Sequence, residues 1–428
     1  MIAPLRSWFN DNFRATKYSA LQADLADRCG TRVEFRVAET PVFVEQRMLD
    51  EMAREGALLA EQLMADAAYL ESARKAIPVG YDVAGQTAHP NFLTADFALV
   101  RDAQGALAPR LVEIQAFPSV FGFQSVLCFA HQRAYELPES LNFYLSGLDE
   151  ESYWNLLART VLGGHDAKHV VLTEVDPQHQ KTLPDFHVTA KKLGIAVVDI
   201  ERLEPNGDKL FYRDKAGALV HIKRIYNRAI ADELMVRRVQ LPFDLTRRWD
   251  VEWAGHPNWY FLISKYSVPW LCRAQKRNTV VPPAVFLDDF LDGRGREELE
   301  GVGVPLPPAG PKATYSELLL KPLFGFAGKG IQFEPTQVEL EAIPVEQRTG
   351  YLLQQRMRFE PTIETPHGMT QAEFRILYLW PDGGELTPAL SLVRLGRGKM
   401  MGVDHNKNQE WVGASAAFFE PQGSEKQT

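Results

Sequence analysis

The sequence has few cysteines and no long apolar run. Cys29, Cys128 and Cys272 are its three cysteines, and their spacing fits neither a zinc site nor a disulfide framework. We therefore expect buried thiols in a reducing compartment. No apolar run approaches the length of a membrane span, so we expect no membrane-spanning segment.

The sequence also lacks a basic stripe and a secretory signal. Its 428 residues carry a formal net charge of −8, which argues against a nucleic-acid-binding surface. Residues 1–17 contain no long apolar segment, so no signal peptide is expected and a cytoplasmic location is predicted. The length predicts two or three domains.

The most informative stretch is residues 318–331, where a short apolar run is followed by glycines. Leu318–Leu320 is predicted to be a buried strand that Pro322 ends. The glycines and lysines of the stretch are Lys321, Gly325, Gly328, Lys329 and Gly330. Glycines let the backbone point several N–H groups at one phosphate, and lysines supply the opposite charge. The alternative is an ordinary glycine-rich turn with solvated lysines.

Residues 95–100 and 110–115 are β-rich and read as the two strands of a hairpin. A symmetric hairpin places Asp96 opposite Glu113, with Gln115 on the same face. Two carboxylates and an amide oxygen on one face suit Mg²⁺ that bridges nucleotide phosphates. The alternative is a half-exposed hairpin with a polar outer face.

Residues 170–172, 183–193 and 195–200 read as strand, helix and strand, which predicts a βαβ unit with parallel strands. A further strand over residues 220–226 leads to Arg228. An arginine at a strand exit commonly binds a carboxylate, and a solvated arginine is the alternative.

Three later segments carry charged residues at or within predicted elements. Residues 256–271 are predicted to be helical and contain Lys265. The strand that begins at Glu373 has Arg375 on the same face, and the last strand carries Arg394 near its exit.

Lys321 with its glycines, residues 354–357, Glu373-x-Arg375 and Arg394 follow one another as they do in the ATP-grasp fold. That family's closing metal motif, Glu-x-Asn, is missing downstream, and its counterpart Glu113-Ile-Gln115 stands upstream. This order resembles the circularly permuted ATP-grasp enzymes, namely eukaryotic-type glutathione synthetase and, more distantly, glutathionylspermidine synthetase. The resemblance covers most of the chain from about residue 90 onward.

The resemblance implies an α/β (α+β) fold: a permuted ATP-grasp module with an inserted βαβ substrate domain and N-terminal helices. The expected divisions are an N-terminal helical region (1–90), the hairpin and metal motif (91–150), the βαβ domain (151–260), the ATP-grasp domain (261–420) and a disordered tail (421–428).

The resemblance also implies ATP and Mg²⁺ as cofactors. Glu113 and Gln115 would hold the metal, with Asp96 as a third oxygen ligand. Lys321, Arg228 and Arg394 would act on the reacting groups. The nucleotide would be bound by Lys265, Lys321, Gly325, Gly328, Lys329, Gly330, Gln354, Gln355, Met357, Glu373 and Arg375. Two departures are Gln115 in place of asparagine, and Gly325 or its neighbours where the synthetase has a metal-binding glutamate.

The activity that the resemblance implies is ATP-dependent ligation of a carboxylate to an amine through an acyl phosphate. The partners would be small-molecule acid and amine substrates, the acid being small or peptide-like, whose identities the sequence does not give. The sequence does not decide whether the protein forms a homodimer. The alternatives are a catalytically degenerate nucleotide-binding protein and a kinase-like phosphotransferase.

Overall fold

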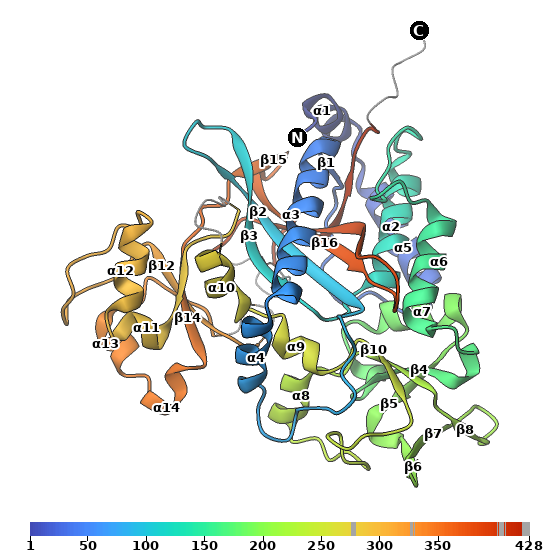
Figure 1. Ribbon diagram of the computed structural model, residues 1–428. Helices are drawn as coiled ribbons and strands as arrows, with labels where there is room; N and C mark the ends of the chain where they lie inside the picture. Colours follow the sequence, from blue (N-terminus) through green and yellow to red (C-terminus); the bar gives the residue numbers. More distant parts are fainter. Residues whose placement is uncertain are drawn as a thin grey trace.

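The computed structural model describes residues 1–274, 280–325, 328, 330–399, 401, 406 and 408–421. These residues form a mixed α/β structure, which confirms the predicted class. Figure 1 shows a broad central sheet covered by helices, a parallel sheet below it and a smaller sheet that projects to one side. The division of the chain into five parts stays a prediction.

The central sheet joins strands from both ends of the chain. Its strand order is β1-β18-β17-β16-β2-β3, with β15 paired to β16. These strands are β1 (Val42–Phe43), β2 (Phe92–Arg101), β3 (Leu107–Gln115), β15 (Pro361–Thr365), β16 (Gly368–Leu379), β17 (Thr387–Gly396) and β18 (Gly413–Phe418). Neighbouring strands in the series from β18 to β3 are antiparallel, whereas β1 runs parallel to β18. The hairpin and the C-terminal strands therefore belong to one sheet.

The two faces of the central sheet pack against different helices because side chains alternate along each strand. Leu93, Ala95 and Phe97 lie in the core that α3 covers, whereas Phe92 lies in the core that includes α5. The helices of the N-terminal half are α1 (Ala3–Asn12), α2 (Ala15–Cys29), α3 (Gln46–Ala65), α4 (Ala67–Lys75), α5 (Phe121–Tyr135), α6 (Glu150–Leu162) and α7 (Leu183–Leu193). Asp96 lies on the same face as Phe92, farther along β2.

The predicted βαβ unit is present. The second sheet has the order β10-β9-β4-β5, and its strands are β4 (Val170–Glu174), β5 (Ala196–Asp199), β9 (Arg224–Asn227) and β10 (Glu252–Ala254). Every neighbouring pair is parallel, and α7 connects β4 to β5. A separate antiparallel sheet contains β6 (Glu204–Asn206), β7 (Lys209–Arg213) and β8 (Leu219–His221).

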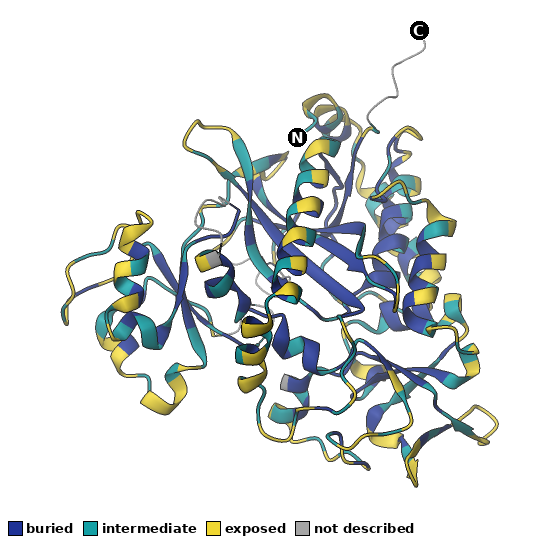
Figure 2. Cartoon of the chain, in the orientation of Figure 1, coloured by how far each residue is buried: buried dark blue, intermediate teal, exposed yellow. Residues whose placement is uncertain are grey.

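The projecting sheet carries the lysine that ends the apolar run. Its order is β11-β14-β12-β13, and its strands are β11 (Ala284–Phe286), β12 (Leu318–Pro322), β13 (Gln332–Phe333) and β14 (Tyr351–Gln355). Its helices are α11 (Leu287–Leu291), α12 (Arg294–Gly301), α13 (Gln337–Glu341) and α14 (Val345–Arg348). A small apolar core of its own holds this unit together. In Figure 2 its strands are largely buried and its helices carry exposed outer faces.

Two sequence-based predictions differ from the structure or lie outside it. Instead of one helix over 256–271 there are two, α9 (Asn258–Leu262) and α10 (Ser267–Ala274), and Lys265 lies between them. Residues 422–428 of the predicted tail are outside the described residues.

The remaining helix is α8 (Ala231–Arg237). Among the described residues, no helix has the length and apolar character needed to cross a membrane.

Candidate functional site

A row of charged side chains runs across four strands of the central sheet. Asp96 of β2 pairs with Glu113 of β3, as the hairpin symmetry predicted. On its other side Asp96 pairs with Arg375 of β16, and Glu373 of β16 pairs with Arg394 of β17. Paired residues of neighbouring antiparallel strands point to the same face, so all five side chains share one surface.

Asp96 is the centre of this row and is 1% exposed. Arg375 Nε and Nη2 donate to its two oxygens at 2.6 Å each, and Arg394 Nη2 donates to Oδ2 at 2.7 Å. Burial alone would raise the pKa of Asp96, yet the two guanidinium groups hold it below its ordinary value. Both oxygens are engaged by arginines, so this geometry gives no support to Asp96 as a third metal ligand.

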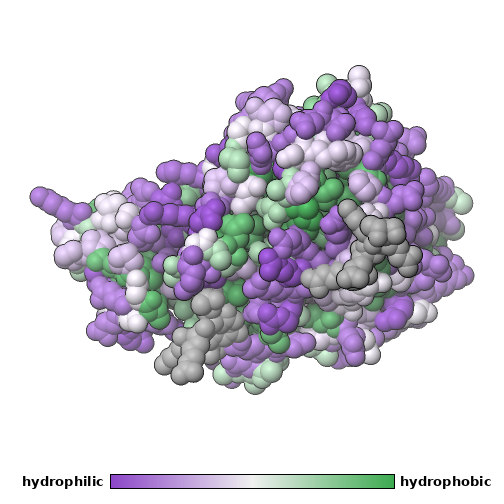
Figure 3. Space-filling view, turned by 90° about the horizontal axis from the view of Figure 1, so that it is seen from above, coloured by the Kyte–Doolittle hydropathy of each residue, from purple (hydrophilic) through white to green (hydrophobic). Residues whose placement is uncertain are grey.

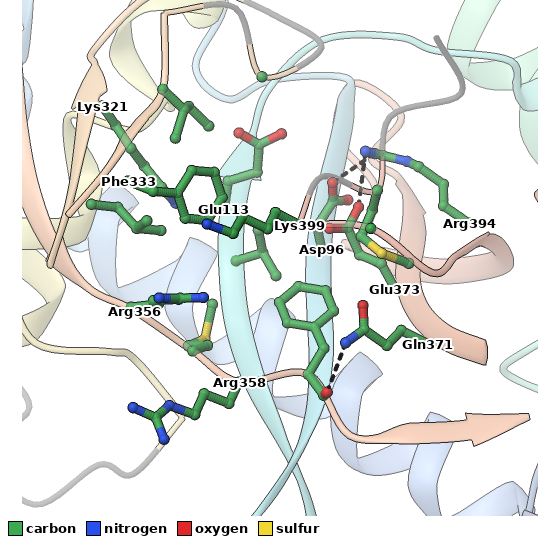
Figure 4. Close-up of a pocket in the computed structure, with 18 of the residues that line it drawn as sticks. Asp96, Glu113, Lys321, Phe333, Arg356, Arg358, Gln371, Glu373, Arg394 and Lys399 are labelled. Atoms are coloured by element: carbon green, nitrogen blue, oxygen red, sulfur yellow. Dashed lines mark hydrogen bonds and ion pairs between the residues drawn. The ribbon is translucent and has the colours of Figure 1, made fainter. Parts of the chain in front are cut away.

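Glu373 is a second buried carboxyl in the row. Arg394 Nη1 lies 2.8 Å from Glu373 Oε1. Burial raises the pKa of Glu373 to about 7 although Arg394 favours its charged form. Arg394 is therefore held between Asp96 and Glu373, with its planar group fixed from two sides, as the dashed lines in Figure 4 show.

A cavity of about 410 Å³ lies over this row and extends to the projecting sheet. In the view from above, hydrophobic side chains gather toward the middle of the face, between the projecting lobe and the bulk of the molecule (Figure 3). The cavity is lined by Asp96, Val112, Glu113, Lys265, Leu319, Lys321, Gly328, Ile331, Phe333, Arg356, Met357, Arg358, Phe359, Gln371, Glu373, Arg394, Arg397, Gly398, Lys399 and Met401.

Two buried lysines face the carboxylates from the other side of the cavity. Lys321 on β12 is 4% exposed, and burial lowers its pKa to about 8, an effect that Glu113 partly offsets. Lys265 Nζ donates to the carbonyl oxygen of Gly325 at 2.7 Å and lies 3.4 Å from Glu113 Oε2. Lys265 therefore links the glycine-rich stretch to Glu113.

Four further cations line the cavity: Arg356, Arg358, Arg397 and Lys399. Arg356 pairs with Glu334 at 2.6 Å and Arg358 with Glu317 at 2.8 Å. The ammonium group of Lys399 lies 5.6 Å from the centre of the Phe333 ring. Together with the two buried lysines they give the cavity a positive character that suits a polyanion.

The remaining lining is apolar and comes mainly from the projecting sheet. Leu319, Ile331 and Phe333 lie on or beside its strands, Met357 follows β14, and Val112 belongs to the hairpin. Figure 4 shows Phe333 and Lys321 on one side of the cavity and Asp96 and Glu373 on the other. An apolar wall beside a cluster of cations has room for a flat ring with an attached polyanion.

The structure brings together only part of the predicted site. Of the predicted residues, the cavity lining includes Asp96, Glu113, Lys265, Lys321, Gly328, Met357, Glu373 and Arg394. Gln115, Gly325, Gly330, Gln354, Gln355, Arg228 and Arg375 are not among its lining residues. Lys329 lies outside the described residues. Gln354 is buried within β14, where its main chain pairs with Leu319 and Ala284.

Arg228 has a partner of its own. It follows β9 as predicted, is buried, and donates through Nη1 to Asp185 of α7. Its guanidinium carbon lies 4.9 Å from the centre of the Phe186 ring and 6.0 Å from that of Phe117. The sequence predicted that Arg228 binds a substrate carboxylate, but in the structure Arg228 donates to the carboxylate of Asp185.

Sequence reasoning missed three cations that line the cavity, Arg356, Arg358 and Lys399. Arg356 and Arg358 lie just after the end of β14, and Lys399 lies shortly after the end of β17. The available signal was that these cations follow strands near a glycine-rich segment. Many cations follow strands, and only the facing arrangement of the projecting and central sheets brings these ones to a common cavity.

Comparison with known proteins supports the fold. Neither a protein-family profile nor a curated protein sequence matches the chain. Among solved structures, the chain is similar to a glutathione synthetase-like effector from Globodera pallida in its apo form, with a TM-score of 0.51 and 12% sequence identity. The alignment covers 94% of this chain and 97% of that chain. At this identity the similarity establishes a shared fold, which agrees with the resemblance found in the sequence.

Proposed function

We propose that this protein is an ATP-dependent carboxylate–amine ligase that acts through an acyl phosphate on a small acid or peptide-like substrate. The observation that carries the proposal is the cavity in which Lys265 and Lys321 face the charged row of the central sheet. The shared fold with a glutathione synthetase-like protein supports the reaction class. The roles below remain proposals for this chain.

In this proposal the nucleotide lies between the two sheets. The base contacts Leu319, Phe333 and Met357, and the phosphates point toward Lys321 and Lys265. A lysine with a pKa of about 8 gains a strong partner when a phosphate arrives, which favours its charged form. The hydrogen bond from Lys265 to Gly325 holds the glycine-rich stretch near the phosphates.

The donor set fits Mg²⁺ that is bound largely through phosphate oxygens. Glu113 lines the cavity, and Gln115 is two residues along the same strand and so on the same face. Within the described residues, no group of three or more acidic, histidine or cysteine side chains forms a metal cluster. Mg²⁺ commonly uses one or two protein oxygens together with phosphates and water. When bound, it would neutralise charge on the phosphates.

The chain's own residues supply charge and orientation. Arg394, fixed by Asp96 and Glu373, presents a guanidinium toward the cavity that holds the acyl phosphate for attack by the amine. Lys321 and Lys265 stabilise negative charge on the phosphoryl group in flight. No side-chain nucleophile takes part.

A nucleotide-binding protein without catalysis is the second candidate, and specific observations favour it. The resemblance places Gly325 or its neighbours where the synthetase has a metal-binding glutamate, and both oxygens of Asp96, the alternative third ligand, accept from arginines. A kinase-like phosphotransferase is a third candidate, which differs in giving a stable phosphorylated product.

A screen for ADP release separates these candidates. The wild type is incubated with ATP, MgCl₂ and pairs from a panel of amino acids, short peptides and polyamines, and ADP, phosphate and amide are assayed. A ligase gives ADP and phosphate only when an acid and an amine are both present. Glu113→Gln should abolish this turnover because it removes the carboxylate nearest the expected metal, whereas Glu61→Gln on an exposed helix face should leave it unchanged.

Three results would contradict the proposal that this cavity carries out ligation. A phosphorylated end product would indicate the kinase. Nucleotide binding without turnover across the whole panel would indicate the scaffold. Equal turnover in the Glu113→Gln variant would show that the reaction does not use this cavity.

A further inference from the structure

Three carboxylates line the cavity between the projecting sheet and the central sheet: Asp96, Glu113 and Glu373. An amine must lose a proton before it attacks an acyl phosphate, because its ammonium form has no lone pair. Formation of an amide in this cavity therefore needs a proton acceptor as well as the cations that hold the phosphate.

Two of the three carboxylates are poor proton acceptors because cations hold them. Arg375 and Arg394 donate to both oxygens of Asp96, and they keep its pKa below the ordinary value although burial opposes this shift. Glu113 lies 3.4 Å from Lys265 Nζ and 3.6 Å from Arg375 Nη2. Glu113 is also the carboxylate nearest the expected metal, so a proton acceptor must be sought elsewhere in the cavity.

Glu373 differs from both in its environment. Within the described part of the chain its ion-pair partner is Arg394 alone, whose Nη1 lies 2.8 Å from Glu373 Oε1. Burial raises the pKa of Glu373 to about 7; Arg394 opposes this shift, whereas Asp96 and Glu113 add to it. Two carboxyls that share one guanidinium but have pKa values shifted in opposite directions can divide the tasks of fixed anion and proton acceptor.

The charged groups around Glu373 come from its own strand and from every strand that faces it. They are Arg375 of β16, Arg394 of β17, Asp96 of β2, Glu113 of β3 and, across the cavity, Lys321 of β12. Lys321 also titrates near neutral pH, with a pKa of about 8, but bound phosphates would favour its charged form. The described lining of the cavity contains no histidine or cysteine. Glu373 is therefore the group of this lining best suited to accept a proton.

Glu373 also lies close to the expected position of the reacting carbon. Arg394, which holds the acyl phosphate in the proposed reaction, contacts Glu373 through Nη1 and Asp96 through Nη2. Figure 4 shows Glu373 beside Arg394 and across the cavity from Lys321 and Phe333, on the side that the nucleotide would occupy. An amine that attacks a group held by this guanidinium must come close to the Glu373 carboxylate.

We propose that Glu373 is a catalytic residue of the ligase, the acceptor of the proton that the amine substrate loses. The Glu373 carboxylate takes one proton from the ammonium group, the nitrogen forms a bond to the acyl carbon, and the bond from that carbon to the phosphate oxygen breaks. The second proton of the nitrogen leaves with the phosphate, and Glu373 returns its own to water. This role rests on the proposed ligase function and differs from the nucleotide contact that the sequence predicted for Glu373.

Hydroxylamine separates this role from a structural one, because it is largely unprotonated at pH 7 and can attack an acyl phosphate without a proton acceptor. Glu373→Gln keeps an oxygen that accepts from Arg394 but cannot take up the proton. With an acid that supports ADP release, this variant should form the amide about 100-fold more slowly than the wild type and the hydroxamate within about threefold of the wild-type rate. Glu61→Gln should match the wild type in both reactions.

The pH dependence of amide formation gives a second readout. The wild-type rate should rise with pH through an inflection as Glu373 loses its proton, whereas the rate of Glu373→Gln should follow only the ionisation of the amine at higher pH. Glu373→Asp keeps a carboxylate on a shorter side chain, so it should keep an inflection at a lower rate. This second variant decides the question if Glu373→Gln does not fold.

An equal loss of amide and hydroxamate formation in Glu373→Gln would overturn the proposal, because Glu373 would then act only through Arg394. Unchanged amide formation in Glu373→Gln, or a Glu373→Asp profile without an inflection, would overturn it as well. Hydroxamate formed by the wild type supports the ligase whatever the variants do, so the role of Glu373 can fail by itself. A wild type that forms neither amide nor hydroxamate with any acid of the panel removes both proposals.

Discussion

At the scale of single residues, Lys321 is the clearest case of a buried charge that costs stability. It is buried, and its pKa falls from an ordinary value of 10.5 to about 8 because burial disfavours the ammonium form. The unfolded chain therefore binds more protons than the folded chain between about pH 8 and pH 10.5. Stability of the wild type consequently rises with pH across this window, and the cost is largest below pH 8.

This cost predicts that Lys321→Met makes the protein without ligand more stable. At pH 7 the free energy of unfolding should increase by about 1–3 kcal/mol, because methionine fills similar space without a charge to desolvate. The gain should shrink as pH rises from 8 toward 10.5. Urea unfolding of the wild type and Lys321→Met at pH 7 and pH 9.5 measures this gain in the free energy of unfolding. A variant less stable than the wild type at pH 7 would contradict the claim that the buried charge of Lys321 costs stability.

At the scale of elements, the charged row depends on how α3 packs on the central sheet. Gly56 of α3 packs closely against the sheet, since a Cβ there would lie 2.2 Å from Tyr378 Oη and 2.9 Å from Ala95 Cβ. Ala95 is the neighbour of Asp96 on β2, with its side chain on the opposite face. A side chain at position 56 would push α3 away from the sheet and would therefore disturb β2, the strand that positions Asp96.

Gly56→Ala should destabilise the fold by about 1–3 kcal/mol through this overpacking. Tyr378→Phe should recover part of the loss when it is combined with Gly56→Ala, because it removes the nearest atom. Gly301→Ala at the end of α12, where nothing lies within 4 Å of an added Cβ, serves as the control. Chemical denaturation of the wild type, Gly56→Ala, Tyr378→Phe and their combination gives the coupling energy. An unchanged stability in Gly56→Ala would show that α3 and the sheet adjust freely.

Elements with local pairing were predictable from the sequence. The pairing of Asp96 with Glu113 follows from a short hairpin, because the loop between two adjacent strands fixes their register. The βαβ unit was likewise visible from its order of strand, helix and strand. The helix predicted around Lys265 was wrong because apolar spacing alone did not show where the chain turns between α9 and α10.

At the scale of the whole molecule, the site depends on contacts that no local pattern specifies. Arg375 and Arg394 reach Asp96 from 279 and 298 residues away. Their positions follow from the pairing of β16 with β2 and β17, which the sequence order does not reveal. The resemblance to permuted ATP-grasp enzymes placed these segments together, but it assigned Asp96 to a metal and Arg228 to a substrate, whereas each is engaged by other side chains of the chain.

The central claim is that the cavity between the projecting sheet and the central sheet binds a magnesium nucleotide. Calorimetric titration of ATP into the wild type, into Lys321→Met and into Lys209→Ala, an exposed lysine of β7, tests it most directly. The account predicts magnesium-dependent binding to the wild type and Lys209→Ala, and affinity lower by at least about tenfold in Lys321→Met, which loses a buried charge opposite the phosphates. Absence of binding to the wild type, or equal affinity in Lys321→Met, would contradict it.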